Sequence, residues 1–247
     1  MSKVLNSKAE IEHPGGLKWV MVFGLSKAIR RSKKNAIIAE LKLYSPKYGD
    51  LLRGRNPFDI LRKYERAGAV GISYITDPKY FRGSFEFFKK LCKETELPVL
   101  RKDFITSKEE IEKTAEAGGS AILLITRVLK EDIFEFVDYA LEHGLDTLVE
   151  VHTTEELEIA VQTKSTMIGI NNRDIGKLEL DDGTVKLTEL LAPKIPNKFI
   201  KVSESGIATI EDLKIALKYA DAALIGTALM KADDPEKLLK TFVEAKP

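Results

Sequence analysis

The chain of 247 residues has only one cysteine, Cys92, so it cannot form an intramolecular disulfide, which is typical of a reducing compartment. It also has almost no net charge, because 39 Lys and Arg residues balance 38 Asp and Glu residues to within +1. This balance favours neither nucleic acid nor a membrane surface as the main partner. No apolar run approaches the ~18 residues of a membrane-spanning helix. We expect a cytoplasmic protein, a monomer or weak oligomer, that acts on a small molecule.

Histidine is scarce as well, and the spacing of His13, His143 and His152 does not fit a metal site. No G-x-G-x-x-G turn follows the first apolar run, which argues against a dinucleotide-binding fold. We therefore expect no metal and no cofactor. We interpret His143, which precedes Gly144, as a helix end, and His152 as a residue at the rim of a site.

What the chain does have is a regular alternation of short apolar runs and helical patterns, in a sequence that is 44% hydrophobic. The predicted strands are Ala36–Lys42, Val70–Thr76, Pro98–Phe104, Ala121–Arg127, Thr147–Val151, Met167–Arg173, Phe199–Gly206 and Ala222–Thr227. Helical patterns between and after them include Asn56–Gly68, Glu131–Gly144, Thr209–Ala220 and Pro235–Ala245. Alternating strands and helices with short links imply a parallel sheet.

Eight such units favour a closed barrel over an open sheet. The fold class we predict is α/β, a single (β/α)8 TIM barrel with an N-terminal helical extension. The barrel and the extension form one domain, 1–247, of which 1–35 is the extension. Within it, the amphipathic segment Leu17–Lys34 either closes the bottom of the barrel or lies across it.

Charged and amide side chains stand at the ends of several predicted strands. Glu40 and Lys42 are two residues apart, so in a strand both point to one side, while Ile37, Ala39 and Leu41 point to the other. The same arrangement places further polar groups at strand ends, namely Lys102, Glu150, Asn171, Arg173 and Glu204. Buried charges are costly unless paired or used, and barrel enzymes carry their chemistry at this end of the strands. Lysines and carboxylates there suit acid–base chemistry or a Schiff base, and a purely structural ion pair between Glu40 and Lys42 is the alternative.

The last two predicted strands end in glycine-containing turns, Ser205-Gly206-Ile207 and Ile225-Gly226-Thr227. Loops at these positions of a barrel often hold phosphate through backbone N–H groups, and a Ser or Thr hydroxyl adds to them. The two turns together predict a phosphate site, to which Lys42 or Arg173 would add positive charge.

Several short motifs occur in order along the predicted strands. They are Ile37–Lys42 with Ser45-Pro46, Ser73–Thr76 with Tyr80–Gly83, Lys102–Ile105, Leu148–Val151, Ile168–Asp174, Glu204–Ile207 and Ile225–Met230. Through these motifs the chain resembles the indole-3-glycerol phosphate synthase family from about Ala36 to Met230. It departs from the family pattern at Tyr44 and Lys47, where a small residue or lysine and a serine are more common.

The resemblance implies a function: closure of the indole ring, decarboxylation and dehydration of 1-(2-carboxyphenylamino)-1-deoxyribulose 5-phosphate, in tryptophan biosynthesis. It implies acid and base roles for Glu40, Lys42, Lys102 and Glu150, with Asn171 and Glu40 as orienting partners. Among these we expect Lys102 to be the ring-closure acid and Glu150 the main acid or base of dehydration, with Lys42 able to take part of that work. Substrate and phosphate contacts are expected at Ser45, Ser73, Phe81, Phe104, Leu123, Arg173, Ile175, Leu178, Glu204, Ser205, Gly206, Gly226 and Thr227.

Three other functions compete with this interpretation. Phosphoribosylanthranilate isomerase resembles it in fold and phosphate loops, but uses a cysteine near the end of strand one, where this chain has Glu40 and Lys42. A non-catalytic phosphometabolite-binding protein would need the glycine turns without two lysines and two carboxylates. A Schiff-base aldolase is the third, and borohydride trapping with substrate would reveal it.

Overall fold

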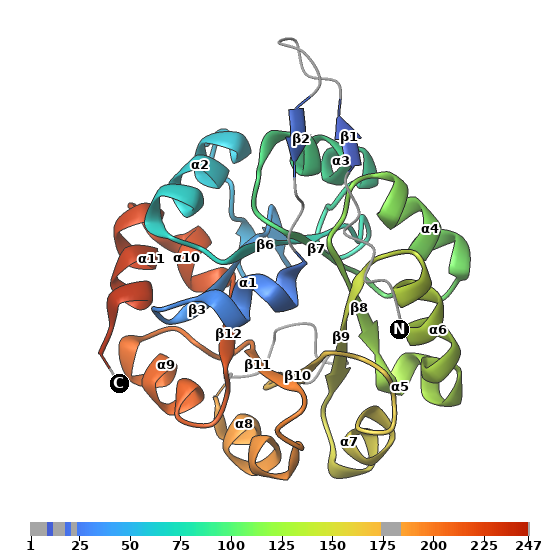
Figure 1. The fold of residues 1–247 in the computed structure, drawn as a ribbon. Coiled ribbons are helices and arrows are strands. Elements are labelled where there is room, and N and C mark those ends of the chain that lie inside the picture. Colours follow the sequence, from blue (N-terminus) through green and yellow to red (C-terminus); the bar gives the residue numbers. More distant parts are fainter. Residues whose placement is uncertain (1–8, 12–17, 21–23, 174–183, 247) are drawn as a thin grey trace.

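The computed structural model describes residues 9–11, 18–20, 24–173 and 184–246, and its central feature is a closed barrel of parallel strands (Figure 1). The barrel strands are β3 (Ala36–Leu41), β6 (Gly71–Ile75), β7 (Val99–Lys102), β8 (Ala121–Ile125), β9 (Asp146–Val151), β10 (Met167–Asn171), β11 (Ile200–Glu204) and β12 (Ala222–Ile225). Each strand pairs with its neighbour in chain order, and β12 closes onto β3. The predicted (β/α)8 fold class is therefore confirmed.

Helices surround the barrel (Figure 1). They are α2 (Pro57–Ala67), α3 (Phe85–Glu94), α4 (Lys108–Glu116), α5 (Thr126–Leu129), α6 (Ile133–Glu142), α7 (Thr154–Ala160), α8 (Lys186–Leu191), α9 (Ile210–Leu217), α10 (Thr227–Lys231) and α11 (Pro235–Glu244), with 3-10 turns η1 (Lys130–Asp132) and η3 (Ala192–Lys194). Helix α9 begins with the capping box of Thr209 and Asp212, in which each side chain accepts a hydrogen bond from the other residue's backbone N–H. Side chains also cap the first N–H groups of α2, at Asn56, and of α11, at Asp234. The predicted helices α2, α6, α9 and α11 all appear within a few residues of their expected bounds.

The strand side chains separate into two apolar layers. Ile37, Ala39 and Leu41 of β3 face outward and pack in a cluster with residues of α2 and α11. The opposite faces of the strands point into the barrel, where Ile38 and Leu100 belong to a second cluster. Every strand of the barrel is covered on both faces, as expected for a parallel sheet, so the interior positions near the carboxyl ends decide what chemistry the barrel offers.

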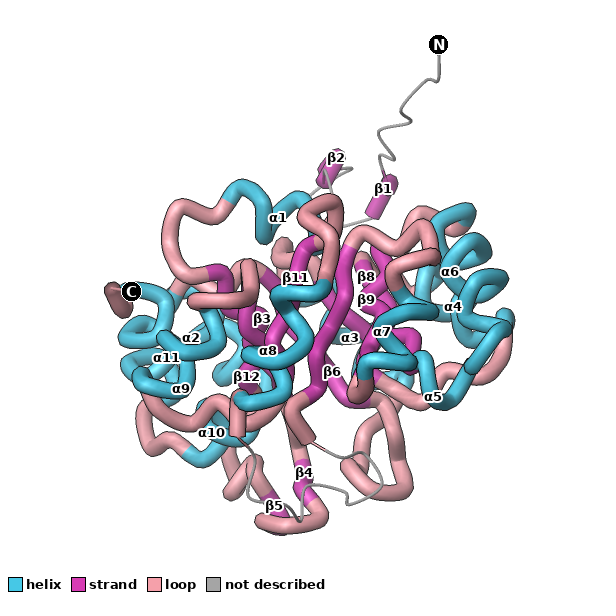
Figure 2. The backbone as a smooth tube through the Cα atoms, turned by 90° about the horizontal axis from the view of Figure 1, so that it is seen from below, coloured by secondary structure: helices cyan, strands magenta, loops and turns pink. Residues whose placement is uncertain are grey.

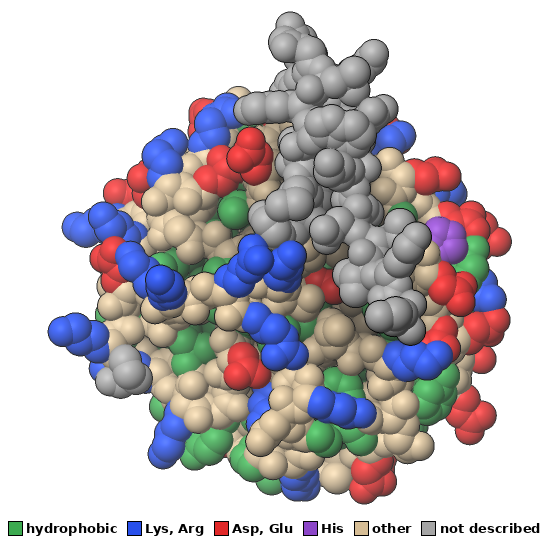
Figure 3. Space-filling view, in the orientation of Figure 1, with side chains coloured by type: hydrophobic (Ala, Val, Ile, Leu, Met, Phe, Trp, Pro, Cys, Tyr) green, Lys and Arg blue, Asp and Glu red, His purple; other side chains and the backbone are tan. Residues whose placement is uncertain are grey.

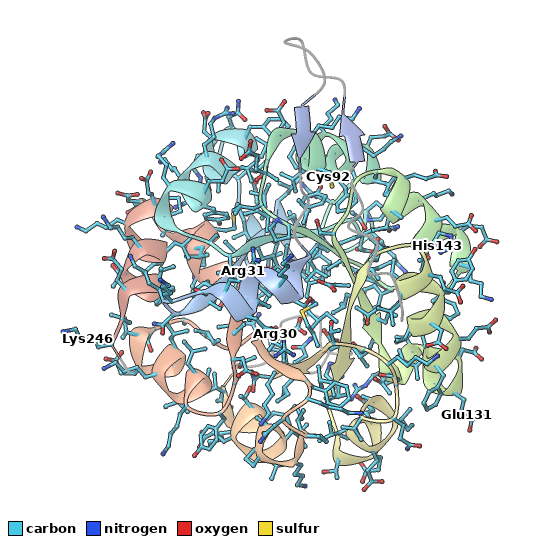
Figure 4. The ribbon with its side chains drawn as sticks, viewed as in Figure 1. Arg30, Arg31, Cys92, Glu131, His143 and Lys246 are labelled. Atoms are coloured by element: carbon cyan, nitrogen blue, oxygen red, sulfur yellow. The ribbon has the colours of Figure 1, made fainter. Side chains whose placement is uncertain are left out.

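One end of the barrel is closed by α1 (Leu25–Arg31), which Figures 1 and 2 show across the amino ends of the strands. Leu25 and Ile29 are buried in the interior cluster. The backbone N–H of Ser26 donates to Asp146 Oδ2 at 2.8 Å, at the start of β9. On this face Lys and Arg side chains are prominent (Figure 3), among them Arg30 and Arg31 (Figure 4). Of the two arrangements predicted for this segment, α1 adopts closure of the barrel bottom.

The extent of this N-terminal helix needs a correction. We predicted a helical extension with an amphipathic segment over Leu17–Lys34, but within this segment the helix covers only Leu25–Arg31. Lys18–Val20 instead forms strand β2, antiparallel to β1 (Ala9–Ile11). Trp and Val favour strands, and the backbone of Gly24 is extended at the start of α1, with φ −55° and ψ 151°.

The other end of the barrel is where the strands finish and where the short pair β4 (Tyr44–Ser45) and β5 (Gly49–Asp50) lies together with α10 (Figure 2). In the part of the chain that the structure describes, no helix is both long and apolar enough to span a membrane.

Candidate active site

A cavity of about 340 Å³ opens at the carboxyl ends of the barrel strands. Most of the predicted site residues line it: Glu40, Lys42, Phe81, Lys102, Phe104, Leu123, Glu150, Asn171, Arg173, Ser205, Gly206, Gly226 and Thr227. Ser45, Ser73 and Glu204 are fully buried and are not among its lining residues. The predicted residues Ile175 and Leu178 lie outside the described residues.

Glu40 and Lys42 form an ion pair, with Lys42 Nζ 3.1 Å from Glu40 Oε1. The same Nζ donates to Thr227 Oγ1 at 3.1 Å and lies 5.8 Å from the centroid of the Phe81 ring. Only 3% of Glu40 and 5% of Lys42 is exposed, so both charges are desolvated and each compensates the other. The structural ion pair and the site interpretation are therefore compatible, because both partners also line the cavity.

Lys102 lies between two buried carboxylates. Its Nζ is 3.7 Å from Glu150 Oε2 and 3.8 Å from Glu204 Oε2. Burial raises the pKa of Glu204 to about 8, the charge of Glu150 adds to this rise, and Lys102 opposes it. Near neutral pH, Glu204 therefore holds its proton for much of the time. The Lys102 ammonium group and the protonated Glu204 carboxyl group therefore lie next to each other.

Two glycines make room for these carboxylates. A Cβ at Gly169 of β10 would lie 1.9 Å from Glu204 Oε1, and a Cβ at Gly226 would lie 2.2 Å from Glu40 Oε1. Any side chain at either position would displace the carboxylate. Packing against Glu204 therefore explains why the motif Ile168-Gly169-Ile170 has a glycine at its centre.

The two glycine turns lie beside each other at one side of the cavity. Ser205 and Gly206 both have left-handed backbone conformations, with φ 64° and 76°. Gly226 precedes α10, and Ser205, Gly206, Gly226 and Thr227 all line the cavity. Free backbone N–H groups at the start of a helix and in a turn can bind an anion.

Apolar side chains line the rest of the cavity, including Phe81, Phe104, Leu123 and Ile125. The Phe81 loop is held by Asp77, whose Oδ2 accepts hydrogen bonds from the backbone N–H groups of Tyr80, at 2.6 Å, and Phe81, at 3.2 Å. The cavity thus joins an apolar wall, a set of acids and bases, and glycine turns suited to an anion.

Comparisons with known proteins agree with this geometry. A family model described as "Indole-3-glycerol phosphate synthase" matches residues 21–242. The chain belongs to the indole-3-glycerol phosphate synthase family. A protein of that name from Pyrococcus abyssi is 81% identical over 227 residues, which cover 92% of this chain and 99% of the relative. Others of that name, from Thermococcus kodakarensis and Methanocaldococcus jannaschii, are 79% and 44% identical over 91% and 89% of this chain, and over 99% and 82% of their own lengths.

Membership of the indole-3-glycerol phosphate synthase family makes the chain a carboxy-lyase of tryptophan biosynthesis. It also decides against the isomerase alternative, in agreement with the location of Cys92. This thiol lies on α3, outside the barrel (Figure 4), and burial raises its pKa to about 12.

Several cavity residues were missed by the sequence reasoning: Tyr48, Asp77, Asp103 and Lys231 also line the cavity. Lys231 Nζ lies 4.1 Å from the centroid of the Tyr48 ring, which joins the loop after β3 to the end of α10. Asp103 had a signal, since it directly follows Lys102 within a family motif. Tyr48 and Lys231 had none, because they meet only through folding.

Proposed function

We propose that this chain converts 1-(2-carboxyphenylamino)-1-deoxyribulose 5-phosphate to indole-3-glycerol phosphate, carbon dioxide and water. The observation that carries this proposal is the position of Lys102, which lines a cavity with an apolar wall and two glycine turns and lies within 4 Å of two buried carboxylates. Family membership supports the same reaction.

The substrate binds with its two ends in different parts of the cavity. Its phosphate is held by the backbone and hydroxyl groups of Ser205, Gly206, Gly226 and Thr227, where helix start and turn N–H groups suit an anion. Its aromatic ring packs against Phe81, Phe104 and Leu123, with Ile175 and Leu178 as the remaining predicted wall. Lys42 neutralises an anionic group of the substrate, and Arg173 contacts an anion or a hydroxyl.

Ring closure needs a proton at the ketone oxygen while the aromatic carbon that carries the carboxylate attacks the carbonyl carbon. Lys102 is the proposed acid, because its ammonium group faces the cavity while two carboxylates hold it in place. Carbon dioxide then leaves the ring carbon that made the attack, and the bonding electrons restore the aromatic ring. Lys42 lies on the neighbouring side of the cavity, next to Phe81.

Dehydration follows, in which the new hydroxyl leaves as water and a proton leaves the adjacent carbon. Glu150 is the proposed main acid or base, and Lys42 can share that work. Glu40 orients Lys42 through their ion pair, and Asn171 orients the substrate from the end of β10. Glu204 is fully buried and is not among the residues that line the cavity, and its contact with Lys102 makes it a brace for this cation.

We also propose that the protein is one domain, works in the cytoplasm as a monomer or weak oligomer, and needs no cofactor. Support for the monomer comes from its surface: the large apolar side chains exposed in the described residues are scattered over different elements, at Tyr48, Phe134, Leu190 and Ile215. Light scattering at micromolar concentration tests this, and a stable dimer would contradict it.

The activity is tested by the fluorescence of indole-3-glycerol phosphate formed from the carboxyphenylamino-deoxyribulose phosphate. We expect turnover without added metal or cofactor. A folded chain that binds the substrate and forms no product would contradict the proposal. Borohydride reduction during turnover, followed by mass measurement, tests the Schiff-base route, and the acid–base route predicts no covalent adduct.

A further inference from the structure

Glu150 has a second neighbour besides Lys102. His152 Nε2 lies 3.3 Å from Glu150 Oε1, and Lys102 Nζ lies 3.7 Å from Glu150 Oε2, so each carboxylate oxygen faces a different nitrogen. Glu150 is fully buried and His152 is 8% exposed. Among the described residues, no donor makes a hydrogen bond of good geometry to either oxygen of Glu150. The imidazole is therefore the nearest group that can exchange a proton with Oε1.

The other ring nitrogen of His152 is held by Glu156 of α7. Nδ1 lies 3.2 Å from Glu156 Oε2, and the backbone N–H of His152 donates to the same oxygen at 2.6 Å. Arg127 Nε donates to Glu156 Oε1 at 2.9 Å, and the Thr153 hydroxyl accepts from the backbone N–H of Glu156 at 3.2 Å. The Glu156 carboxylate is thus fixed at the first turn of the helix.

Glu156 is ionised and can only accept. Burial alone would raise its pKa, but the hydrogen bonds from His152 and Arg127 outweigh this and lower the pKa to about 2. The proton between Glu156 and the imidazole must then be on Nδ1. In the neutral ring this leaves a lone pair on Nε2, the nitrogen that lies 3.3 Å from Glu150 Oε1 and that makes no hydrogen bond of good geometry among the described residues.

Two buried acceptor atoms, an imidazole nitrogen and a carboxylate oxygen, repel each other at 3.3 Å unless one of them carries a proton. We propose that His152 is a positioning residue that keeps one exchangeable proton at Glu150, either as the carboxyl group facing Nε2 or as an imidazolium facing the carboxylate. This inference rests on the proposed function, in which Glu150 acts in the dehydration step. It gives Glu150 a proton supply that is separate from Lys102.

The proton balance is simple. Glu150 gives its proton to the leaving hydroxyl, which departs as water, and His152 remains neutral with its Nδ1 proton. The proton taken from the adjacent carbon by another group, or one from solvent, then restores the shared proton. In the described part of the chain, the charged groups in contact with the imidazole are Glu150 and Glu156, and these pair in turn with Lys102 and Arg127.

The first test needs no turnover. Nitrogen NMR of the full chain labelled at histidine reports which ring nitrogen of His152 carries a proton, and the three histidines of the chain make assignment by single variants direct. We expect Nδ1 to carry a proton in the wild-type chain and the Nε2 signal to move in Glu150→Gln. A neutral ring with its proton on Nε2, or an Nε2 signal insensitive to Glu150→Gln, would overturn the proposal.

The second test is kinetic. His152→Gln should lower kcat at least ~10-fold with KM within about twofold, and one ionisation should disappear from the pH profile of kcat. Added imidazole should restore part of kcat in His152→Ala. The matched control is His143→Gln, because His143 lies at the outer rim of the molecule, away from the barrel axis (Figure 4), and should leave kcat unchanged.

The outcomes separate this inference from the proposed function. A wild-type chain that forms no product contradicts the proposed function, while the NMR result still decides the position of the proton. An active wild-type chain with an equally active His152→Gln and an unchanged pH profile overturns the role of His152. Loss of kcat together with a large fall in thermal stability and no rescue by imidazole would indicate a structural role and overturn it as well.

Discussion

Lys102 Nζ lies within 4 Å of both Glu150 and Glu204, and both carboxylates are fully buried. Burying a charge is costly unless other charges or hydrogen bonds compensate it. Here one ammonium group compensates two carboxylates, so the three side chains are more stable when one carboxylate carries a proton. A site that retains a proton near neutral pH is suited to acid catalysis.

Replacing Lys102 tests the ring-closure acid. In Lys102→Ala we expect kcat to fall at least ~100-fold, because the ketone oxygen loses its proton donor. The control is Lys113→Ala on the exposed side of α4, which should leave turnover unchanged. Steady-state rates and circular dichroism measure activity and folding, and near-normal turnover would remove Lys102 from the acid role.

Replacing Glu150 tests the dehydration step. Glu150→Gln keeps the shape of the side chain but removes its proton exchange, so turnover should slow at least ~100-fold. If ring closure is unaffected, a ring-closed intermediate should accumulate, which rapid quenching and mass spectrometry would detect. Wild-type rates in this variant would mean that another residue carries the step.

The raised pKa of Glu204 predicts how stability depends on pH. Between the ordinary glutamate value and about 8, the native chain binds more protons here than the unfolded chain, so this group's contribution to the free energy of unfolding falls as pH rises. Glu204→Gln removes that titration. The difference in free energy of unfolding, variant minus wild type, should therefore rise by at least about 1 kcal/mol from pH 5 to pH 9.

Chemical unfolding at both pH values measures this change. Glu211→Gln, at an exposed position of α9, is the control and should show no such gain. An equal effect of Glu204→Gln at pH 5 and pH 9 would contradict the raised pKa.

At the scale of elements, the ends of β11 and β12 and the start of α10 form the proposed phosphate site. Ala228 lies in the first turn of α10 and lines the cavity. Ala228→Asp adds a negative charge there, whereas Ala228→Asn adds nearly the same volume without charge. We expect the Asp variant to bind inorganic phosphate and the substrate at least ~10-fold more weakly than the Asn variant, through charge repulsion.

Calorimetric titration at two salt concentrations measures the difference. The gap between the two Ala228 variants should narrow at high salt, because the repulsion is screened. Equal affinities would place the phosphate elsewhere.

Helix α1 is the element that closes the opposite end. Leu25 is fully buried against the barrel interior, and a Cβ on Gly71 would lie 2.5 Å from its Cδ1. Leu25→Ala should therefore cost about 2–5 kcal/mol of stability while kcat stays near wild type. Leu190→Ala on α8, where the side chain is 58% exposed, is the control, and equal losses in the two variants would contradict a packed bottom.

Much of the fold could be predicted because its signals are local. Apolar runs such as Ala36–Leu41, helix caps such as Thr209 and Asp212, and strand parity each act over a few residues. Parity alone also placed Glu40 and Glu150 inside the barrel. The helix start at Gly24 could not be predicted in this way, because its first N–H groups depend on Asp146, 120 residues away from Ser26.

The site was predictable where motifs mark strand ends and not where loops meet. Tyr48 and Lys231 come together only when the segment after β3 folds over α10. His152 was interpreted as a rim residue, yet it contacts both Glu150 and Glu156 from the end of β9. The hydroxyl of Ser45, whose contact with the substrate stays a prediction, accepts hydrogen bonds from the backbone N–H groups of Lys47 and Tyr48 within its own loop.

At the scale of the whole molecule, the barrel separates stability from chemistry. Helix α1 lies at the amino ends of the strands and β4 and β5 at the carboxyl ends (Figure 2). The interior next to α1 is apolar, and the cavity at the carboxyl ends is lined by charged side chains. This division is general for (β/α)8 barrels. It explains why buried charges can be concentrated at one end without disrupting the core.

The most direct test of this account is a crystal structure of the chain with a substrate analogue whose ketone is reduced to an alcohol, so that the ring cannot close. We predict the phosphate at Gly206 and Gly226, the aromatic ring against Phe81 and Phe104, and the alcohol oxygen within hydrogen-bond distance of Lys102 Nζ. An analogue bound with its phosphate away from the two glycine turns, or with its alcohol out of reach of Lys102, would contradict the account.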